Sequence, residues 1–366
     1  MHPPTRDIPF IQALRAVGVL CVTWTHLAVS FSSDQHLGVL PLVGWVRVFV
    51  TQPLGIIQDF GWLGVCLFFL VSGFVIAHVA ERHTAVSFLV KRLLRIYPPL
   101  WGAVLIALLL DPALRTAGIA DVLLGMSLFN YFTVPQTVVL GVAWTLIIEI
   151  CFYATVLVLF RLRRRPFVMI AAELILVTLV IGMCKRWGDH FFLFAAGYAY
   201  LPYLIIGQIF YHGIFKRTIH PAVTGLLLAG AVAVLLFGLT TIHTQFLPPS
   251  NSYLLSFGYA FLLFLILLSL RPKRLPAWIA YLADISYPLY LLHGTVGLSV
   301  FLSVLPFTGT GGAALAAFAG SVIASDLLHR VVELPSVQFG NRVVRSLPRS
   351  LSVPPSAGKE DALIHA

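Results

Sequence analysis

The sequence predicts an all-α integral membrane protein, a bundle of about ten transmembrane helices with both termini in the cytoplasm. Of its 366 residues, 59% are hydrophobic and only 10% are charged, whereas about 25% of the residues of a soluble protein are charged. Long apolar runs separated by short charged connections recur along the whole chain. Such runs are typical of bilayer-spanning helices, because a helix satisfies its backbone hydrogen bonds internally.

The apolar runs define the predicted spans in order. The first run begins near Phe10 and is followed by many others without a small-residue cleavage site. We therefore interpret it as a retained span and not as a cleaved signal peptide. The segments 33–59 and 112–136 are interrupted by Pro, Asp and Gly, and we interpret them as interfacial or re-entrant. The predicted spans are 10–31, 61–80, 97–111, 138–160, 167–184, 191–212, 221–240, 252–270, 278–303 and 311–331.

The distribution of positive charge predicts the orientation of the bundle. Of the 24 Lys and Arg residues, 19 lie in the set of connections that includes both termini, and 4 lie in the opposite set. Because Lys and Arg are enriched in cytoplasmic loops, we expect a multi-pass protein of the inner (plasma) membrane with cytoplasmic termini. This pattern accounts for the net charge of +10, so we expect membrane lipid and no nucleic acid as a partner.

The chain divides into two predicted parts. Residues 1–345 form a membrane domain, and residues 346–366, which are rich in Ser and Pro, form a disordered cytoplasmic tail. No internal repeat and no soluble domain is visible in the sequence. Any chemistry must therefore be built from the helices and their short connections.

Two polar residues of the first span, Arg15 and His26, are the first candidates for a functional site. Ionisable residues inside a span cost about 2.5–3.5 kcal/mol on insertion scales, so they are functional candidates. Eleven helical residues make about three turns plus 20°, which puts both side chains on one face about 16 Å apart. This spacing suits a long anionic ligand with a cation at one end and a base at the other. The alternative is that Arg15 reaches the interface and His26 hydrogen-bonds a neighbouring helix.

Two carboxylates and a second histidine also fall within predicted spans. Glu149 lies near the middle of its span, where it should be protonated or paired. A catalytic role and a structural ion pair between helices both remain open for it. Glu173 lies near a span end and could reach the interface, and His293 has the pattern of a core histidine at a depth similar to that of His26.

The basic cluster at residues 91–95 precedes a predicted span and contains Arg92 and Arg95. Such clusters commonly fix topology, and the functional alternative is a phosphate-binding rim, for which the planar fork of Arg is well suited. The sequence contains no phosphate-binding glycine loop, no zinc-protease motif and no serine-hydrolase motif. The four cysteines show no metal-ligand spacing, so we expect no metal site.

Six segments, taken together and in this order, resemble the acyltransferase 3 family of membrane O-acyltransferases. The sequence also departs from the family pattern at Cys66, where Asp is usual, and at Ile150, where a second acidic residue often follows Glu149. The six segments are Ala13 to Val17 with His26, Gly64 to Phe74, Phe88 to Pro98, Trp144 to Leu146 with Glu149, Phe152 and Tyr153, Ile285 to His293, and Glu333 to Pro335.

The resemblance implies transfer of an acetyl or other short acyl group from acyl-CoA, with acetyl-CoA the expected donor. The acceptor would be a hydroxyl of a glycan, as in polysaccharide O-acetylation, of a lipid-linked saccharide or of a small metabolite. His26 would act as general base, Glu149 would orient it or a substrate hydroxyl, and the CoA phosphates would be held by Arg15, Arg92 and Arg95. The competing hypotheses are a transporter or flippase of an anionic amphiphile and a catalytically silent binding subunit.

Overall fold

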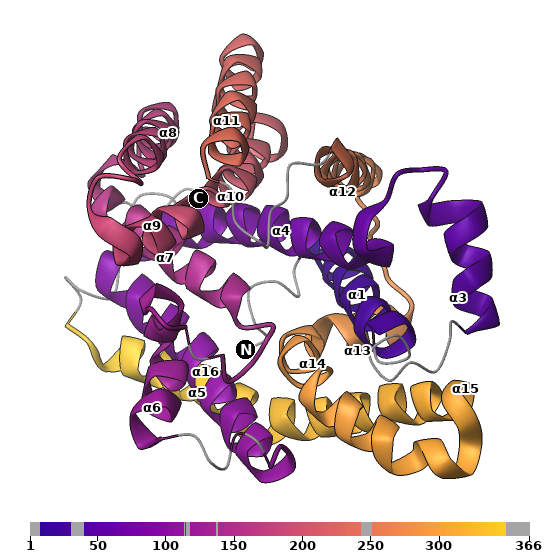
Figure 1. The fold of residues 1–366 in the computed structure, drawn as a ribbon. Helices are drawn as coiled ribbons and strands as arrows, with labels where there is room; N and C mark the ends of the chain where they lie inside the picture. The colour runs from indigo at the N-terminus through magenta and orange to yellow at the C-terminus, as the bar shows by residue number, and fades with distance from the viewer. Residues whose placement is uncertain are drawn as a thin grey trace.

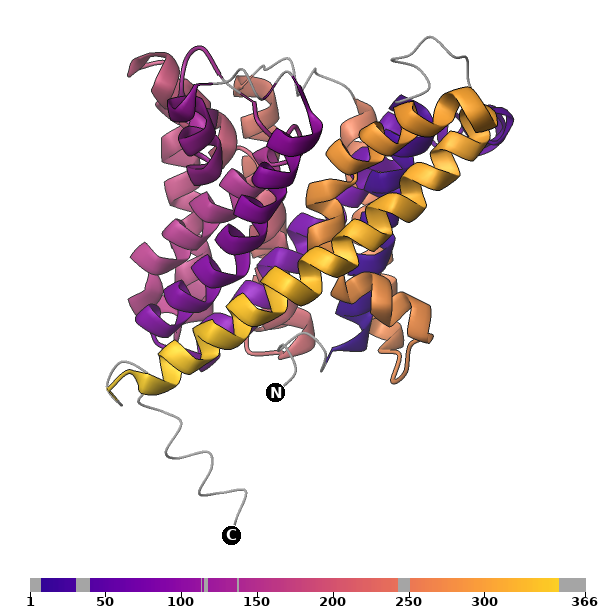
Figure 2. The ribbon, with the colours of Figure 1, turned by 90° about the horizontal axis from the view of Figure 1, so that it is seen from below.

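The computed structural model of the protein describes residues 8–30, 40–112, 114, 118–136, 138–242 and 251–348. All regular structure in these residues is helical and they form no strand, which confirms the all-α class. The predicted tail lies outside the described residues from position 349 onward. In the side view of Figure 2, the start of the first helix and the end of the last lie at the same end of the bundle.

The helices follow one another with short connections. In the segments interpreted from sequence as interfacial or re-entrant, the helices of the described residues are short and lie from Pro41 to Phe60 and from Ile119 to Phe132. The α-helices are α1 Pro9–Trp24, α3 Pro41–Val46, α4 Gly61–Arg82, α5 Ala85–Leu110, α6 Ile119–Ser127, α7 Trp144–Val158, α8 Pro166–Gly182, α9 Gly188–Tyr198, α10 Leu201–Ile209, α11 Pro221–Thr241, α12 Asn251–Leu270, α13 Ala277–Asp284, α14 Ser286–Leu292, α15 Thr295–Leu328 and α16 Leu334–Ser346. The shorter or wider turns are η1 Thr25–Ser30, η2 Arg47–Thr51, η3 Ile57–Phe60, η5 Phe129–Phe132, η6 Phe160–Leu162, η7 Phe210–Phe215 and η8 His329–Glu333.

Seven helical segments of the described chain are long and apolar enough to cross a membrane. The predicted count of ten is therefore not reached by this criterion. Helices α7 and α8 have 15 and 17 residues, which is shorter than the roughly 20 residues that span a bilayer without thinning it. The seven segments are Pro9–Val29, Ile57–Arg82, Ala85–Leu110, Gly188–Phe215, Pro221–Thr241, Ser252–Leu270 and Thr295–Ser346.

The last of these segments, Thr295–Ser346, contains a reversal at Gly309. This residue has φ 65° and ψ −179°, a backbone conformation that residues with a Cβ rarely adopt. Figure 2 shows the two arms as a helical hairpin, one arm orange and the other orange to yellow. The segment thus contributes two antiparallel arms, which correspond to the separate spans predicted before and after residue 309.

The start of α5 differs from the predicted span 97–111. The helix begins at Ala85 and runs through Pro98 and Pro99, although prolines in a helix interior remove backbone hydrogen bonds. Thr84 caps its first turn by accepting the Ser87 N–H at 3.2 Å. The basic cluster is therefore part of the helix that enters the bundle, and not a loop before it.

Helix α4 forms the centre of the bundle (Figure 1). In its most apolar window 89% of the residues are buried, against 28% in the peripheral helix α11. Glycines allow its neighbours to approach closely, as in many membrane helix pairs. A Cβ added at Gly73 would lie 1.7 Å from Leu204 O of α10, and one at Gly64 would lie 2.7 Å from Gly18 O of α1. These contacts fix α1 and α10 against opposite parts of α4.

Candidate active site

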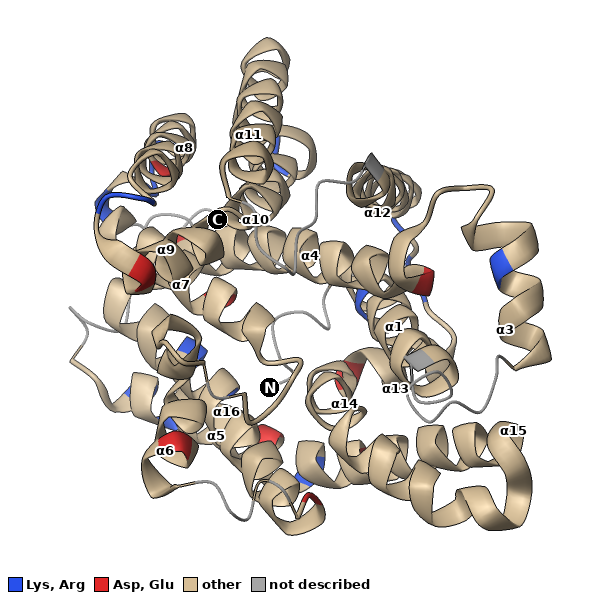
Figure 3. Cartoon of the chain, in the orientation of Figure 1, with Lys and Arg blue, Asp and Glu red and all other residues tan. Residues whose placement is uncertain are grey.

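Four of the five predicted site residues line one cavity between α1, α4, α5, α7 and α14. Arg15, Arg92, Arg95 and Glu149 surround about 820 Å³ of space that contains no protein atoms. Figure 3 shows how few charged positions the bundle carries and that α1, α5 and α7 are among the helices that carry them. The convergence of charges from three separate helices is the feature that marks this cavity as the candidate site.

Arg15 enters the cavity from α1. Pro9 occupies the first turn of this helix, where its missing N–H costs nothing, and the Gly18–Gly64 approach brings α1 against α4. The Arg15 side chain is 9% exposed, so it does not reach a polar interface as the alternative interpretation required. Its charge interacts with those of Arg95, Glu333 and Glu149.

Arg92 and Arg95 enter from α5, three residues apart and therefore on one face of the helix. Arg92 is only 6% exposed, so the predicted rim at the membrane surface is instead a buried wall. Within the described part of the chain, the Nε of Arg92 has no hydrogen-bond partner. The three cavity arginines likewise form no ion pair within 4.0 Å among the described residues. The cavity thus holds three cations and a single carboxylate.

That carboxylate, Glu149 of α7, is held by two hydroxyl groups. Ser72 of α4 donates a hydrogen bond to its Oε1, and Tyr153, one helical turn further along α7, donates to its Oε2 at 3.0 Å. Tyr153 also interacts with Arg92. The interhelical contact of Glu149 is therefore a hydroxyl–carboxylate bond, and not the ion pair left open from the sequence.

Ser72 and Tyr153 were missed as site residues, because uncharged hydroxyl groups are common in spans. Their only sequence signals are the spacing of Tyr153 four residues after Glu149 and the position of Ser72 in the second-span segment. The far wall contains two more such residues. Tyr290 of α14 donates to Val142 O at 3.0 Å and accepts a hydrogen bond from Thr145 Oγ1 at 2.9 Å. This pair locks α14 to the start of α7.

His26, the predicted base, is not among the residues that line this cavity. It lies in η1, just beyond the end of α1, with its ring centroid 5.0 Å from that of His293. The His293 ring in turn lies 6.0 Å from that of Tyr290, which lines the cavity. The structure thus places Arg15 in the lining of the cavity and His26 outside that lining, connected to it by ring contacts through His293 and Tyr290.

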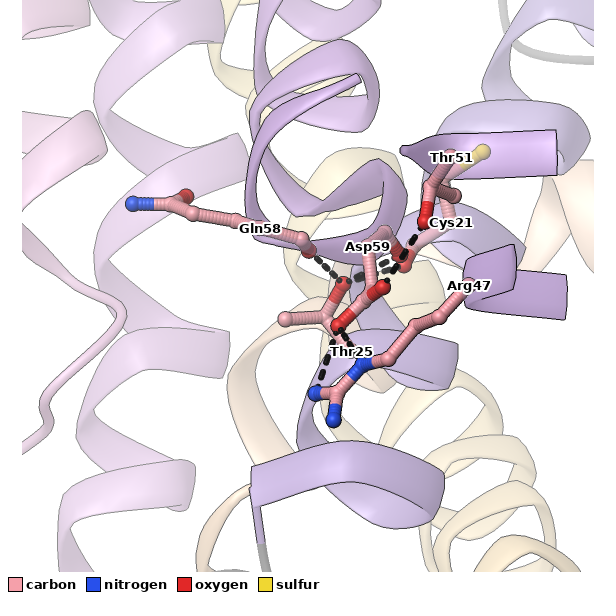
Figure 4. Close-up of polar contacts among 6 residues, drawn as sticks. All are labelled: Cys21, Thr25, Arg47, Thr51, Gln58 and Asp59. Carbon is pink, nitrogen blue, oxygen red and sulfur yellow. Dashed lines mark hydrogen bonds and ion pairs between the residues drawn. The ribbon is translucent and has the colours of Figure 1, made fainter. Parts of the chain in front are cut away.

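A polar network fixes the backbone next to His26 (Figure 4). Gln58, Asp59 and Phe60 all have positive φ angles, of 55°, 45° and 80°, which is strained for residues with a Cβ. Thr25 donates to the carbonyl oxygens of Gln58 and Asp59 at 2.8 and 3.0 Å, while the Asp59 carboxylate binds Arg47 at 2.8 Å. The residue that precedes His26 is therefore tied to η3, directly before α4, and through Asp59 to η2.

The electrostatic field at the mouth of α4 and α5 is positive. His83 follows the last residue of α4, and its Nε2 lies 3.3 Å from Lys91 Nζ. Burial and the charges of Lys91, Arg92 and Arg82 lower the pKa of His83 to about 4. The imidazole is therefore neutral at pH 7 and adds no further positive charge to this end.

A second pocket lies on another face of α1 and has a different chemistry. The pocket has an empty volume of about 1330 Å³. Its lining consists mainly of apolar residues of α1, α3 and α15, together with Thr23. The Thr23 hydroxyl donates to Val19 O within its own helix. The described lining of this pocket contains no Asp, Glu, Lys, Arg or His side chain. The charged cavity is therefore the candidate site. Among the described residues, no three His, Cys, Asp or Glu side chains could together hold a metal ion.

The chain is similar to known acyltransferases. The sequence model of a family described as "Acyltransferase domain" matches residues 8–330. The acyltransferase MdmB of Streptomyces mycarofaciens is 26% identical over 391 aligned residues, which cover 93% of this chain and 95% of that protein. Nodulation protein 10 of Rhizobium leguminosarum bv. viciae is 36% identical over 124 residues, which cover 28% of this chain and 34% of that protein. No solved structure matches.

Proposed function

We propose that this chain, which belongs to the acyltransferase domain family, transfers an acetyl or other short acyl group from acyl-CoA to a hydroxyl. The family match and the similarity to MdmB show that the chain is a membrane acyltransferase for groups other than aminoacyl groups. The acceptor is a glycan, a lipid-linked saccharide or a small metabolite. The observation that carries the proposal is the cavity with three arginines and one carboxylate.

The charges of the cavity fit the donor. CoA carries its phosphates at one end and its thioester at the end of a flexible arm, and Arg is the side chain best suited to bind phosphate in a bidentate way. The buried Nε of Arg92 has no partner in the described chain, and a buried donor without an acceptor is costly. A phosphate oxygen would satisfy it. The excess of cations over carboxylates in the lining also favours an anionic ligand.

The proposed reaction needs one base. His26 takes the proton of the acceptor hydroxyl, the oxygen attacks the thioester carbonyl carbon, and the C–S bond breaks. The protonated His26 returns its proton to the departing CoA thiolate, so atoms and charge balance. Because the arginines line the cavity while His26 lies outside its lining, beside His293, the donor approaches from the arginines and the acceptor from the histidines. Glu149, with Ser72 and Tyr153, orients the groups that meet at the wall.

We extend the proposal to topology, with ten spans and both termini in the cytoplasm of the inner membrane. The common end of the first and last described helices in Figure 2 supports it. Cysteine introduced at the exposed Gln52 should react with an impermeant maleimide in intact cells, while one at the exposed Lys273 should react only after lysis. The wild type supplies the background, since three of its four cysteines are buried. The reverse pattern would invert the orientation and contradict loading of CoA from the cytoplasm.

The direct test uses purified protein in proteoliposomes with radiolabelled acetyl-CoA. Acceptors are presented as separate extracts of glycans, membrane lipids and small metabolites from the source cells. We expect stoichiometric release of free CoA and transfer of label to one extract, and loss of both in the His26→Ala variant. Uptake or movement of an amphiphile without CoA release would instead support the transporter. Binding of acetyl-CoA with neither transport nor transfer would support the silent subunit.

A further inference from the structure

The histidine next to His26 has a defined protonation pattern. His293 follows α14, is fully buried, and places its Nδ1 3.0 Å from Leu289 O. A carbonyl oxygen only accepts hydrogen bonds, so Nδ1 carries the hydrogen. No carboxylate pairs with His293 among the described residues, and an isolated buried cation would be unfavourable. The ring is therefore neutral, and its Nε2 presents a lone pair.

This lone pair has a suitable neighbour. In the described part of the chain, Nε2 of His293 makes no hydrogen bond to a protein atom, although it is buried. Buried acceptors are nearly always satisfied. The His26 ring lies with its centroid 5.0 Å away and tilted by 53°, which brings the edges of the two imidazoles within reach of one hydrogen bond. A small rotation of the His26 side chain would direct an N–H toward Nε2.

We propose that His293 is a positioning residue, whose Nε2 accepts an N–H of His26 and so directs the other nitrogen of His26, with its lone pair, toward the acceptor hydroxyl. The inference rests on the proposed acyl transfer. The acceptor proton moves to the other nitrogen of His26, which then carries two N–H groups, one still held by His293. When the C–S bond breaks, that proton passes to the CoA thiolate, and His293 keeps the same protons throughout.

The position of His293 explains why such a device is needed. His26 lies in the π-helical turn η1 beyond α1 and is partly exposed, so packing does not enclose its ring completely. The Thr25 network fixes the backbone on one side, and His293 fixes the ring on the other. Because the His293 ring also lies next to the Tyr290 ring, a displacement of Tyr290 would change the position of His293 and, through it, the orientation of the His26 ring.

The test compares two substitutions of His293 by kcat, KM and melting temperature. His293→Leu removes the acceptor, and we expect kcat to fall about 100-fold, the effect of misplacing a catalytic group by about 1 Å. KM for acetyl-CoA should stay within about twofold. His293→Gln places an amide oxygen near the former Nε2, so its kcat should return to within about threefold of the wild type. A Leu variant with unchanged kcat, or a Gln variant as slow as the Leu variant, would overturn the proposal.

A double variant and a matched control separate positioning from general damage. If His293 acts through His26, then His26→Ala/His293→Leu should be no slower than His26→Ala alone. Additive losses would contradict the proposal. The control is His78→Leu. His78 is also buried, but it belongs to α4 and lies outside the site, so the kcat of this variant should stay within about twofold of the wild-type value. The wild type is assayed first, so that absence of acyl transfer there overturns the proposed function before any variant is compared.

Discussion

Two buried or half-buried carboxylates in the bundle, Glu149 and Glu173, have contrasting surroundings. Glu149 lines a cavity with three arginines and accepts hydrogen bonds from Ser72 and Tyr153. Glu173 of α8 is fully buried and accepts one hydrogen bond, from Gln208 Nε2 at 3.3 Å. The interpretation that Glu173 reaches the interface is therefore wrong, because its neighbours on α10 cover it.

The difference shows that burial alone does not identify a functional carboxylate in a membrane. Glu173 meets one amide and lines neither the charged cavity nor the apolar pocket beside α1. It connects α8 to α10, two helices that pack directly. Glu149 instead faces open space and three arginines, which form no ion pair within 4.0 Å among the described residues. Available volume and uncompensated charge are the features that distinguish a site from a structural contact.

The largest effect is expected from removing the proposed base, His26. His26→Ala should lower the rate of acyl transfer about 10² to 10⁴-fold, with expression and melting temperature nearly unchanged. The measurement is CoA release in proteoliposomes together with a thermal melt. An activity within threefold of the wild type would remove His26, and the histidine pair with it, from the mechanism.

The carboxylate itself should give the next largest effect. Glu149→Gln keeps the shape of the side chain but lacks the charge, and its NH2 group replaces one of the two oxygens that accept from Ser72 and Tyr153. We expect turnover to fall about 10- to 100-fold, the magnitude of a lost charge-assisted interaction, with the fold intact. Loss of stability with unchanged turnover per folded molecule would give Glu149 the structural role assigned here to Glu173.

The donor side of the cavity is tested by Arg15→Lys. Lysine keeps the charge but loses the planar fork that suits phosphate. Losing one charge-assisted hydrogen bond costs about 1.5–3 kcal/mol, so KM for acyl-CoA should rise about tenfold to hundredfold while the acceptor KM changes little. A change confined to the acceptor KM would place Arg15 at the other substrate.

The smallest effect is expected at Glu173. Glu173→Gln preserves the shape of the side chain and offers an amide to Gln208, so turnover should stay within about twofold of the wild-type value. The melting temperature should change by only a few degrees, which corresponds to roughly 1 kcal/mol in the free energy of unfolding. Assayed beside Glu149→Gln, this variant carries the same chemical change in a different setting. Equal losses of turnover in the two variants would erase the distinction between them.

The sequence predicted the charged part of the site better than the uncharged part. Arg15, Arg92, Arg95 and Glu149 stand out because a charge in an apolar span is costly, and all four line the cavity. Their catalytic and binding roles stay predictions. Ser72 gave no such signal, because a hydroxyl in a span is common and its partner lies 77 positions away.

Two structural features limited what the pattern could show. Helical periodicity put Arg15 and His26 on one face, but it could not reveal that only Arg15 lines the cavity, while the His26 ring lies against His293, which follows α14. The number of spans was also difficult to predict. Short helices such as α7 and the reversal at Gly309 depend on packing against neighbouring helices, which no single window of sequence contains.

The most direct test of the account is equilibrium binding of acetyl-CoA to purified protein by titration calorimetry. Wild type is compared with Arg92→Gln, which removes the buried guanidinium from the cavity, and with Arg164→Gln, which removes an exposed one elsewhere. The account predicts that Arg92→Gln weakens binding about tenfold to hundredfold, while Arg164→Gln binds as the wild type does. Equal affinity of all three proteins for acetyl-CoA would contradict the assignment of the cavity as the donor site.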